Sequence, residues 1–251
     1  MDHQGTTPEA SVEARALSKS YRPGAWALRD LSFELRAGEI VGLLGENGAG
    51  KTTTLRLLCS LLSPNSGAVC INGMRVGPDS PASRRAIGVM FGAEPGLYER
   101  LTGRENIEYH ARLNGLTRAA ASERADSLAT MLGMHEYIDR MVRTYSSGMR
   151  QKTALARTVA HDPPILLFDE PTSGLDVSST ETVHDFLRER RAAGHAILLS
   201  SHRLDEVERL CDRLIVLHEG RMAASGTPRE LALEANGDLR SRFLSIIRAD
   251  R

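Results

Sequence analysis

Residues 45–52, Gly-Glu-Asn-Gly-Ala-Gly-Lys-Thr, constrain the fold of this chain more than any other segment. They fit the P-loop pattern G-x-x-x-x-G-K-[ST], between an apolar run that predicts a strand, residues 39–44, and a helical pattern that starts at residue 50. Glycines allow successive backbone N–H groups to point at one anion, and a helix N-terminus adds partial positive charge. We therefore expect a strand, a phosphate-binding loop and a helix in this order.

Two side chains of the loop have distinct expected roles. Lys51 can reach the β- and γ-phosphates of a nucleotide as a mobile charge, and the Thr52 hydroxyl can ligate Mg²⁺. The pattern alone leaves kinases, GTPases, helicases and transporters open. The candidate nucleotide-binding residues are Gly45, Glu46, Asn47, Gly48, Ala49, Gly50, Lys51, Thr52 and Thr53.

A second candidate site element is the acidic pair Asp169-Glu170, which follows the apolar run 165–168. If this strand ends near the phosphate loop, Asp169 can reach the metal directly or through water. Glu170 leaves the strand in a different direction and could position or deprotonate an attacking water. Two acids after a strand can also be merely solvated, but a phosphate loop in the same chain favours the catalytic interpretation.

Strands alternating with helices predict an α/β fold with a mainly parallel sheet. Continuous apolar runs predict strands buried on both faces, and Asn72-Gly73 predicts a hairpin turn. The loop helix is expected to continue to Leu62, and Ser178 to cap a helix that ends at Gly194. The expected strands are 12–17, 27–35, 39–44, 68–71, 165–168, 196–199, 213–217 and 221–224.

Residues 97–161 differ from the rest because helical patterns dominate them. Thr102-x-x-Glu105 is a capping box, and further helices are expected near 119–132 and 147–161. An apolar stripe close to the C-terminus (Leu239, Phe243, Ile246 and Ile247) fits either core packing or a partner contact, with packing favoured. The expected organisation is a disordered tail at 1–11, one domain at 12–226 (core 12–96 and 162–226, helical subdomain 97–161) and a C-terminal helical tail at 227–251.

Charge and hydropathy exclude some functions. The 32 basic residues equal the 32 acidic ones, so nothing predicts a general nucleic-acid binder. A run of about 18 apolar residues, which a membrane-spanning helix needs, does not occur in the sequence. The guanine-reading motif N-K-x-D does not occur either, which argues against a GTPase.

Three further motifs resemble the ATP-binding cassette family. Residues 145–152, Tyr-Ser-Ser-Gly-Met-Arg-Gln-Lys, are similar to the family's signature segment L-S-G-G-Q. Ser173-Gly174-Leu175-Asp176 matches the family's dimer-contact loop, and Ser201-His202 lies where the family has its switch histidine. The order and spacing of these motifs, together with the P-loop and the acidic pair, extend the resemblance over nearly the whole chain.

The resemblance implies a P-loop NTPase (RecA-like) core, an N-terminal antiparallel β subdomain and an inserted α-helical subdomain. It also implies hydrolysis of ATP with Mg²⁺ by two cassettes paired head to tail, with Asp169 at the metal and Glu170 as the catalytic carboxylate. His202 would bind the γ-phosphate, and Tyr21 would stack on adenine unless it packs in the core. The signature residues Ser146, Ser147, Gly148 and Met149 would contact ATP on the other chain, and Ser173, Gly174, Leu175 and Asp176 would line the dimer seam.

The chain departs from the family pattern in two places. After residues 87–90 the usual loop glutamine is missing, so either Glu94 replaces it or the loop couples by shape alone. The signature has Ser147 and Met149 where glycine and glutamine are usual, which puts a glutamine-specific contact in doubt.

Residues 96–106 resemble a subgroup that powers export of drugs, lipids, polysaccharides or sodium. The resemblance therefore implies an export motor at the cytoplasmic face of the membrane, bound to separate permease subunits and without nucleic acid. The alternative is a soluble cassette ATPase of DNA repair or translation.

Overall fold

The computed structural model describes residues 10–77, 85–92, 96–235 and 237–248. Its strands are β1 (Ala10–Arg22), β2 (Ala25–Arg36), β3 (Ile40–Leu44), β4 (Ser66–Ile71), β5 (Met74–Val76), β6 (Ile87–Met90), β7 (Ile165–Asp169), β8 (Ala196–Ser201), β9 (Arg213–His218) and β10 (Arg221–Gly226). Its α-helices are α1 (Lys51–Leu58), α3 (Gly103–Leu113), α4 (Arg118–Met131), α5 (Ser147–Thr158), α6 (Val177–Ala192), α7 (Leu204–Leu210), α8 (Pro228–Leu233) and α9 (Leu239–Arg248).

The strands form two sheets. One has the order β2-β1-β4-β5 with antiparallel pairs, and the other has the order β10-β9-β3-β8-β7-β6. In the second sheet the neighbours from β9 to β6 are parallel, and only the edge strand β10 is antiparallel. The predicted α/β class with a mainly parallel sheet is confirmed, and β3 of this sheet lies in the chain between β2 and β4 of the antiparallel sheet.

The parallel sheet is buried on both faces, which explains its continuous apolar runs. Along β7, Leu166 and Phe168 belong to one hydrophobic cluster, whereas Ile165 and Leu167 belong to the other. Strands β3 and β8 alternate in the same way. One cluster includes apolar residues of α3 to α7, and the other includes α1 and the antiparallel sheet. The sheet is therefore a rigid platform between two cores, and its strand ends are fixed in position.

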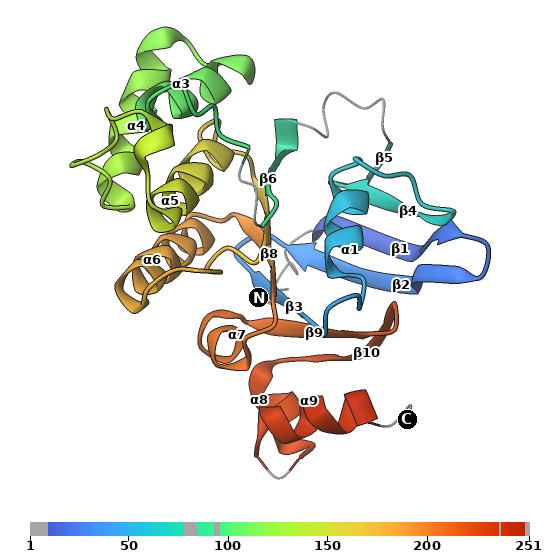
Figure 1. Cartoon of the computed structure of the whole chain (residues 1–251). Coiled ribbons are helices and arrows are strands. Elements are labelled where there is room, and N and C mark those ends of the chain that lie inside the picture. Colours follow the sequence, from blue (N-terminus) through green and yellow to red (C-terminus); the bar gives the residue numbers. More distant parts are fainter. Residues whose placement is uncertain (1–9, 78–84, 93–95, 236, 249–251) are drawn as a thin grey trace, which may run out of the picture.

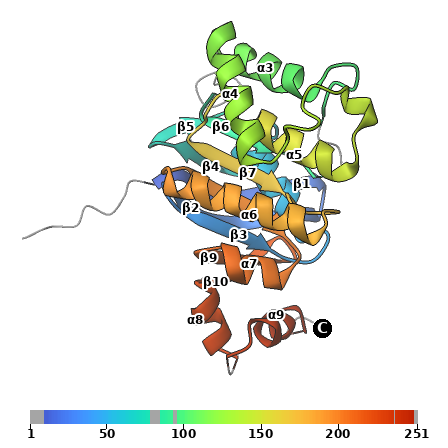
Figure 2. The same cartoon turned by 90° about the vertical axis from the view of Figure 1, so that its left-hand side faces the viewer.

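The helices divide into groups in space. Helices α3, α4 and α5 lie together at one end of the molecule, well away from the antiparallel sheet (Figure 1). Helices α8 and α9 lie at the opposite end, beside the β9–β10 edge (Figures 1 and 2). In the C-terminal stripe, Leu239 and Ile246 are buried and Phe243 packs against the core, which supports the packing interpretation.

Four helix ends differ from the sequence-based expectations, and one of them is the end of α6 at Ala192 in place of the expected Gly194. Helix α1 ends at Leu58, not at Leu62, because Ser60 adopts a positive φ of 59° and Leu61 N–H bonds the Arg56 carbonyl, closing a Schellman-type cap. Helix α6 is capped by Asp176, which accepts a hydrogen bond from Ser179 N, and not by Ser178. Helix α5 ends at Thr158, before the expected His161.

Strand β1 begins at Ala10, two residues earlier than expected, while residues 1–9 lie outside the described part. Among the described residues, no helix is both long enough and apolar enough to cross a lipid bilayer.

Candidate active site

The phosphate loop connects β3 to α1, as its sequence predicts. Gly50, at the helix N-cap, has a φ of 108°, and a Cβ there would lie 2.6 Å from the Ala27 carbonyl oxygen. A Cβ on Gly45 would lie 2.6 Å from the Leu217 carbonyl oxygen. The loop is therefore packed against β2 and β9 so closely that only glycine fits at these two positions.

Lys51 is the cation of this loop, and only 7% of its surface is exposed. Its ammonium group donates to the carbonyl oxygens of Gly45, at 2.6 Å, and Glu46, at 3.2 Å. Burial lowers the pKa of Lys51, and this effect is opposed by the nearby carboxylates of Glu170 and Asp169. A partly desolvated ammonium beside the N-terminus of a helix is well suited to bind an anion.

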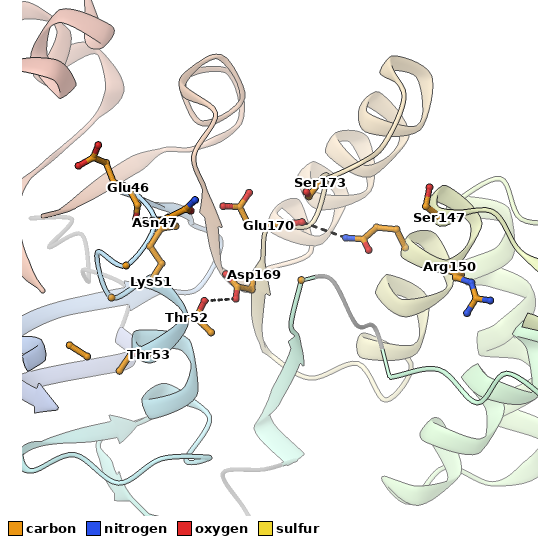
Figure 3. A pocket seen from close by; sticks show the side chains of 15 residues that line it. Glu46, Asn47, Lys51, Thr52, Thr53, Ser147, Arg150, Asp169, Glu170 and Ser173 are labelled. Atoms are coloured by element: carbon orange, nitrogen blue, oxygen red, sulfur yellow. Dashed lines mark hydrogen bonds between the residues drawn. The ribbon is translucent and has the colours of Figure 1, made fainter. Parts of the chain in front are cut away.

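The end of β7 meets the start of α1 through a hydrogen bond. The Thr52 hydroxyl donates to Asp169 Oδ2 at 2.7 Å (Figure 3). Ser200 Oγ donates to Asp169 Oδ1 at 2.5 Å. A hydroxyl and a carboxylate oxygen at this separation are a donor set that Mg²⁺ accepts in nucleotide sites. The residues present therefore fit a magnesium ion at this point.

Asp169 is the last residue of β7, and at Glu170 the chain turns away from the direction of the strand. Glu170 has a φ of +53°, and its backbone N–H bonds Ser200 of the adjacent strand β8. Its Oε2 lies 2.7 Å from His202 Nδ1, and the His202 side chain is 57% exposed. A carboxylate and an imidazole in contact beside a phosphate loop can hold and deprotonate a water molecule.

The first turn of α5 provides the far wall of the site. Ser147, Arg150 and Gln151 line the same cleft of about 600 Å³ as the phosphate loop, at the opposite end (Figure 3). Ser146 caps α5, since its Oγ accepts from Met149 N at 3.3 Å and its N–H lies 3.4 Å from Met149 Sδ. Met149 thus completes a capping box, where the family pattern has glutamine.

The cleft brings together most of the predicted loop residues and both acids. Its predicted lining residues are Glu46, Asn47, Gly48, Gly50, Lys51, Thr52, Thr53, Ser147, Asp169, Glu170 and Ser173. The predicted residues outside its lining are Tyr21, Gly45, Ala49, Ser146, Gly148, Met149, Gly174, Leu175, Asp176 and His202. His202 lines an adjoining hollow with Glu46 and Asn47.

Tyr21 lies at the end of β1, and 54% of its surface is exposed, so it is not a core residue. Its hydroxyl lies 3.3 Å from Thr53 Oγ1, and Lys19 Nζ lies 5.8 Å from the centre of its ring. The ring is therefore held next to the loop helix with open surface around it.

Four residues that line the cleft were not predicted from the sequence: Ala27, Gly92, Arg150 and Gln151. Gln151 is buried, and its side-chain amide donates to the Pro171 carbonyl at 2.8 Å and lies 3.5 Å from the Glu170 carbonyl. The only sequence signal for it was its place two residues after Met149 in the signature segment. Glu94, the candidate for the missing glutamine, lies outside the described residues.

The loop 173–176 forms a turn between the acidic pair and α6. Ser173 N–H bonds the Glu170 carbonyl, and Gly174 has a φ of 74°. Asp176 is fully exposed at the N-terminus of α6, where the N–H and the hydroxyl of Ser179 lower its pKa. The Asp176 carboxylate is therefore ionised on the surface.

Comparisons with known proteins agree with this arrangement. Residues 28–173 match the family model described as ABC transporter. The chain is 44% identical over 220 residues to the ABC transporter ATP-binding protein NatA of Bacillus subtilis (87% of this chain, 89% of NatA). It is 39% identical over 228 residues to the Nod factor export ATP-binding protein I of Ralstonia nicotianae (90% of this chain, 70% of that protein).

A solved structure shares the fold. The ATP-binding cassette MJ0796, in a dimeric post-hydrolysis state bound to ADP and Pi, superposes with a TM-score of 0.79. The sequence identity is 25%, and the match covers 87% of this chain and 99% of that one.

Proposed function

Because this chain belongs to the ABC transporter family, as an ATP-binding subunit, we propose that it hydrolyses ATP to drive export through separate membrane-spanning subunits. One observation carries the proposal: a single cleft contains the Lys51 ammonium, the Thr52–Asp169 pair and the Glu170 carboxylate. Phosphoryl transfer to water needs charge stabilisation, a metal site and an oriented water, and these residues supply each of them.

Within this cleft, each side chain has a proposed task. Lys51 and the N–H groups of residues 45–53 bind the β- and γ-phosphates. Thr52 and Asp169 would hold Mg²⁺, which would neutralise phosphate charge when it is bound. Glu170 orients and deprotonates the attacking water, and His202 bonds the γ-phosphate and supports Glu170 through their 2.7 Å contact.

The second proposed component is another cassette. Ser146, Ser147, Gly148 and Met149 at the start of α5 would face the ATP of the partner chain. Gly148 supports this because, within the described part of its own chain, a Cβ there would meet only Leu175 and Ser179, at 3.6 Å and 3.9 Å. The protein's own packing would therefore allow a side chain at position 148. The absence of one suits a close approach of ATP bound to the partner chain. The loop Ser173, Gly174, Leu175 and Asp176 would lie at the same seam.

The remaining partners follow from the family. We place the protein at the cytoplasmic face of a membrane, bound to permease subunits, with export as the direction because one relative is named for Nod factor export. A role in DNA repair or translation is not favoured, since the relatives are transporter subunits and the net charge is zero. The direct test is phosphate release from ATP by the purified chain, and absence of release above background would contradict the proposal.

Removal of Mg²⁺ should stop hydrolysis, because the ion is proposed to contribute several kcal/mol of charge stabilisation. With excess EDTA we expect phosphate release to fall at least about 100-fold and to recover when Mg²⁺ is added. Asp169→Asn should lower the rate strongly at limiting Mg²⁺ and shift the Mg²⁺ dependence of hydrolysis to higher concentrations, since an amide is a weaker metal ligand. Full activity of Asp169→Asn in coupled phosphate assays would exclude Asp169 from the metal site.

Tyr21→Ala should weaken ATP binding by about 5- to 150-fold, because one stacked base is worth about 1–3 kcal/mol. Tyr21→Phe retains the aromatic face and should bind nearly as well as the natural chain. Titration with a fluorescent ATP analogue measures both affinities. Equal affinities of the alanine and phenylalanine variants would show that adenine does not stack on this ring.

A further inference from the structure

A buried carboxylate lies behind the active site, outside the cleft. Glu206, on α7, is 2% exposed. Its Oε1 accepts from Thr172 Oγ1 at 2.5 Å and lies 3.1 Å from His184 Nε2, while its Oε2 accepts from Ser201 Oγ at 2.7 Å. Removing a carboxylate from water is costly unless hydrogen bonds compensate, and here both oxygens are used.

The hydroxyl partners of Glu206 lie next to the two proposed catalytic side chains. Thr172 follows Glu170 by two residues, and Ser201 directly precedes His202. The Ser201 hydroxyl also accepts from Arg203 N at 3.0 Å. This bond links the residue before His202 to the residue after it. One carboxylate thus ties the segment that carries Glu170 to the segment that carries His202.

We propose that Glu206 is a positioning residue that sets the spacing between Glu170 and His202 by holding Thr172 with one oxygen and Ser201 with the other. This inference rests on the proposed function, because it assigns a purpose to the Glu170–His202 contact in ATP hydrolysis. Glu206 itself touches neither the cleft nor the proposed reacting atoms, so its effect must pass through Thr172 and Ser201.

The surroundings of the two catalytic side chains explain why such a tie is needed. The His202 side chain is 57% exposed, so packing around it does not fix its position, whereas the Glu170 side chain is only 22% exposed. Their 2.7 Å contact depends on where the two backbone segments lie. Gln151 holds the Glu170 segment from α5 through the Pro171 carbonyl, and Glu206 holds it from α7 through Thr172.

The charge state of Glu206 agrees with this role. Burial raises its pKa, but the hydrogen bonds from His184, Thr172 and Ser201 outweigh burial and leave the pKa below its ordinary value. The carboxylate is therefore ionised at neutral pH and can accept from all three groups at once. A neutral amide would have only one acceptor oxygen and would weaken at least one of these bonds.

Steady-state hydrolysis by four full-length variants tests the proposal. In Thr172→Val the hydroxyl is lost with little change of shape, and in Glu206→Gln one acceptor oxygen is lost. For both we expect kcat to fall about 10- to 100-fold, the range associated with misplacing catalytic groups by about 1 Å, with KM for ATP within about twofold. Thr172→Ser restores the hydroxyl and should restore kcat, and Glu208→Gln, exposed on the same helix, should match the natural chain.

Three results of these rate measurements would overturn the positioning role of Glu206. If Thr172→Val keeps the natural kcat, or if Thr172→Ser is as slow as Thr172→Val, Glu206 does not position the catalytic pair. A rise in KM with kcat unchanged would also overturn the proposal, because it would indicate an effect on ATP binding alone. If the natural chain releases no phosphate, the proposed function fails first, and this inference fails with it. Thermal unfolding of each variant confirms that rates are compared between folded proteins.

Discussion

Replacing Glu170 by glutamine should reduce ATP hydrolysis about 10²- to 10⁴-fold and leave ATP affinity nearly unchanged. This reduction in rate is the one expected when an enzyme loses its general base. Glutamine has the same shape but cannot accept a proton from water, whereas the proposed phosphate contacts of Lys51 and the loop are not altered by the substitution. Phosphate release under saturating Mg-ATP and equilibrium binding of a fluorescent ATP analogue give the two quantities.

Glu208→Gln is the matched control for Glu170→Gln, because it makes the same chemical change on the exposed side of α7. It should hydrolyse ATP at the natural rate. A Glu170→Gln rate within about twofold of the control would remove Glu170 from the catalytic role, since a general base contributes far more than this factor. Another carboxylate would then have to activate the water.

Substitution of Lys51 by alanine should abolish measurable ATP binding, with a loss of affinity of at least about 100-fold. The ammonium is the one positive side chain inside the loop, residues 45–52, and charged hydrogen bonds to phosphate are worth about 1.5–3 kcal/mol each. It donates to the carbonyls of Gly45 and Glu46, which holds it inside the loop where phosphate would bind. Isothermal titration with Mg-ATP measures the change.

Arg229→Ala is the control for Lys51→Ala. It also removes a positive charge, but from the exposed surface of α8, and it should leave ATP affinity unchanged. If Lys51→Ala bound ATP as tightly as this control, the assignment of residues 45–52 as the phosphate cradle would be wrong.

Local patterns in the sequence predicted the features that depend on local physics. The P-loop could be located because glycine spacing, the strand before it and the helix after it are all encoded within about 20 residues. The buried strands could be predicted because a parallel sheet covered on both faces needs continuous apolar runs. The capping box at Thr102 and Glu105 was predicted from residues three apart, and it forms.

Contacts between distant residues could not be predicted in the same way. Gln151 bonds a carbonyl 20 residues later in the chain, and Glu206 bonds Thr172, which is 34 residues earlier. Such pairs depend on how α5 and α7 pack against the sheet, and no spacing in the sequence encodes this. The choice of Asp176 over Ser178 as the cap of α6 was missed because both residue types are good caps.

The proposed function requires that ATP is bound between two cassettes, each of which supplies groups that complete the ATP site of the other. The mass of Glu170→Gln in solution, measured by light scattering with and without saturating Mg-ATP, tests it most directly. We predict one chain of 27.4 kDa without nucleotide and twice this mass with Mg-ATP, because ATP that is not hydrolysed holds the pair closed. A mass of one chain, with ATP shown to be bound, would contradict the claim.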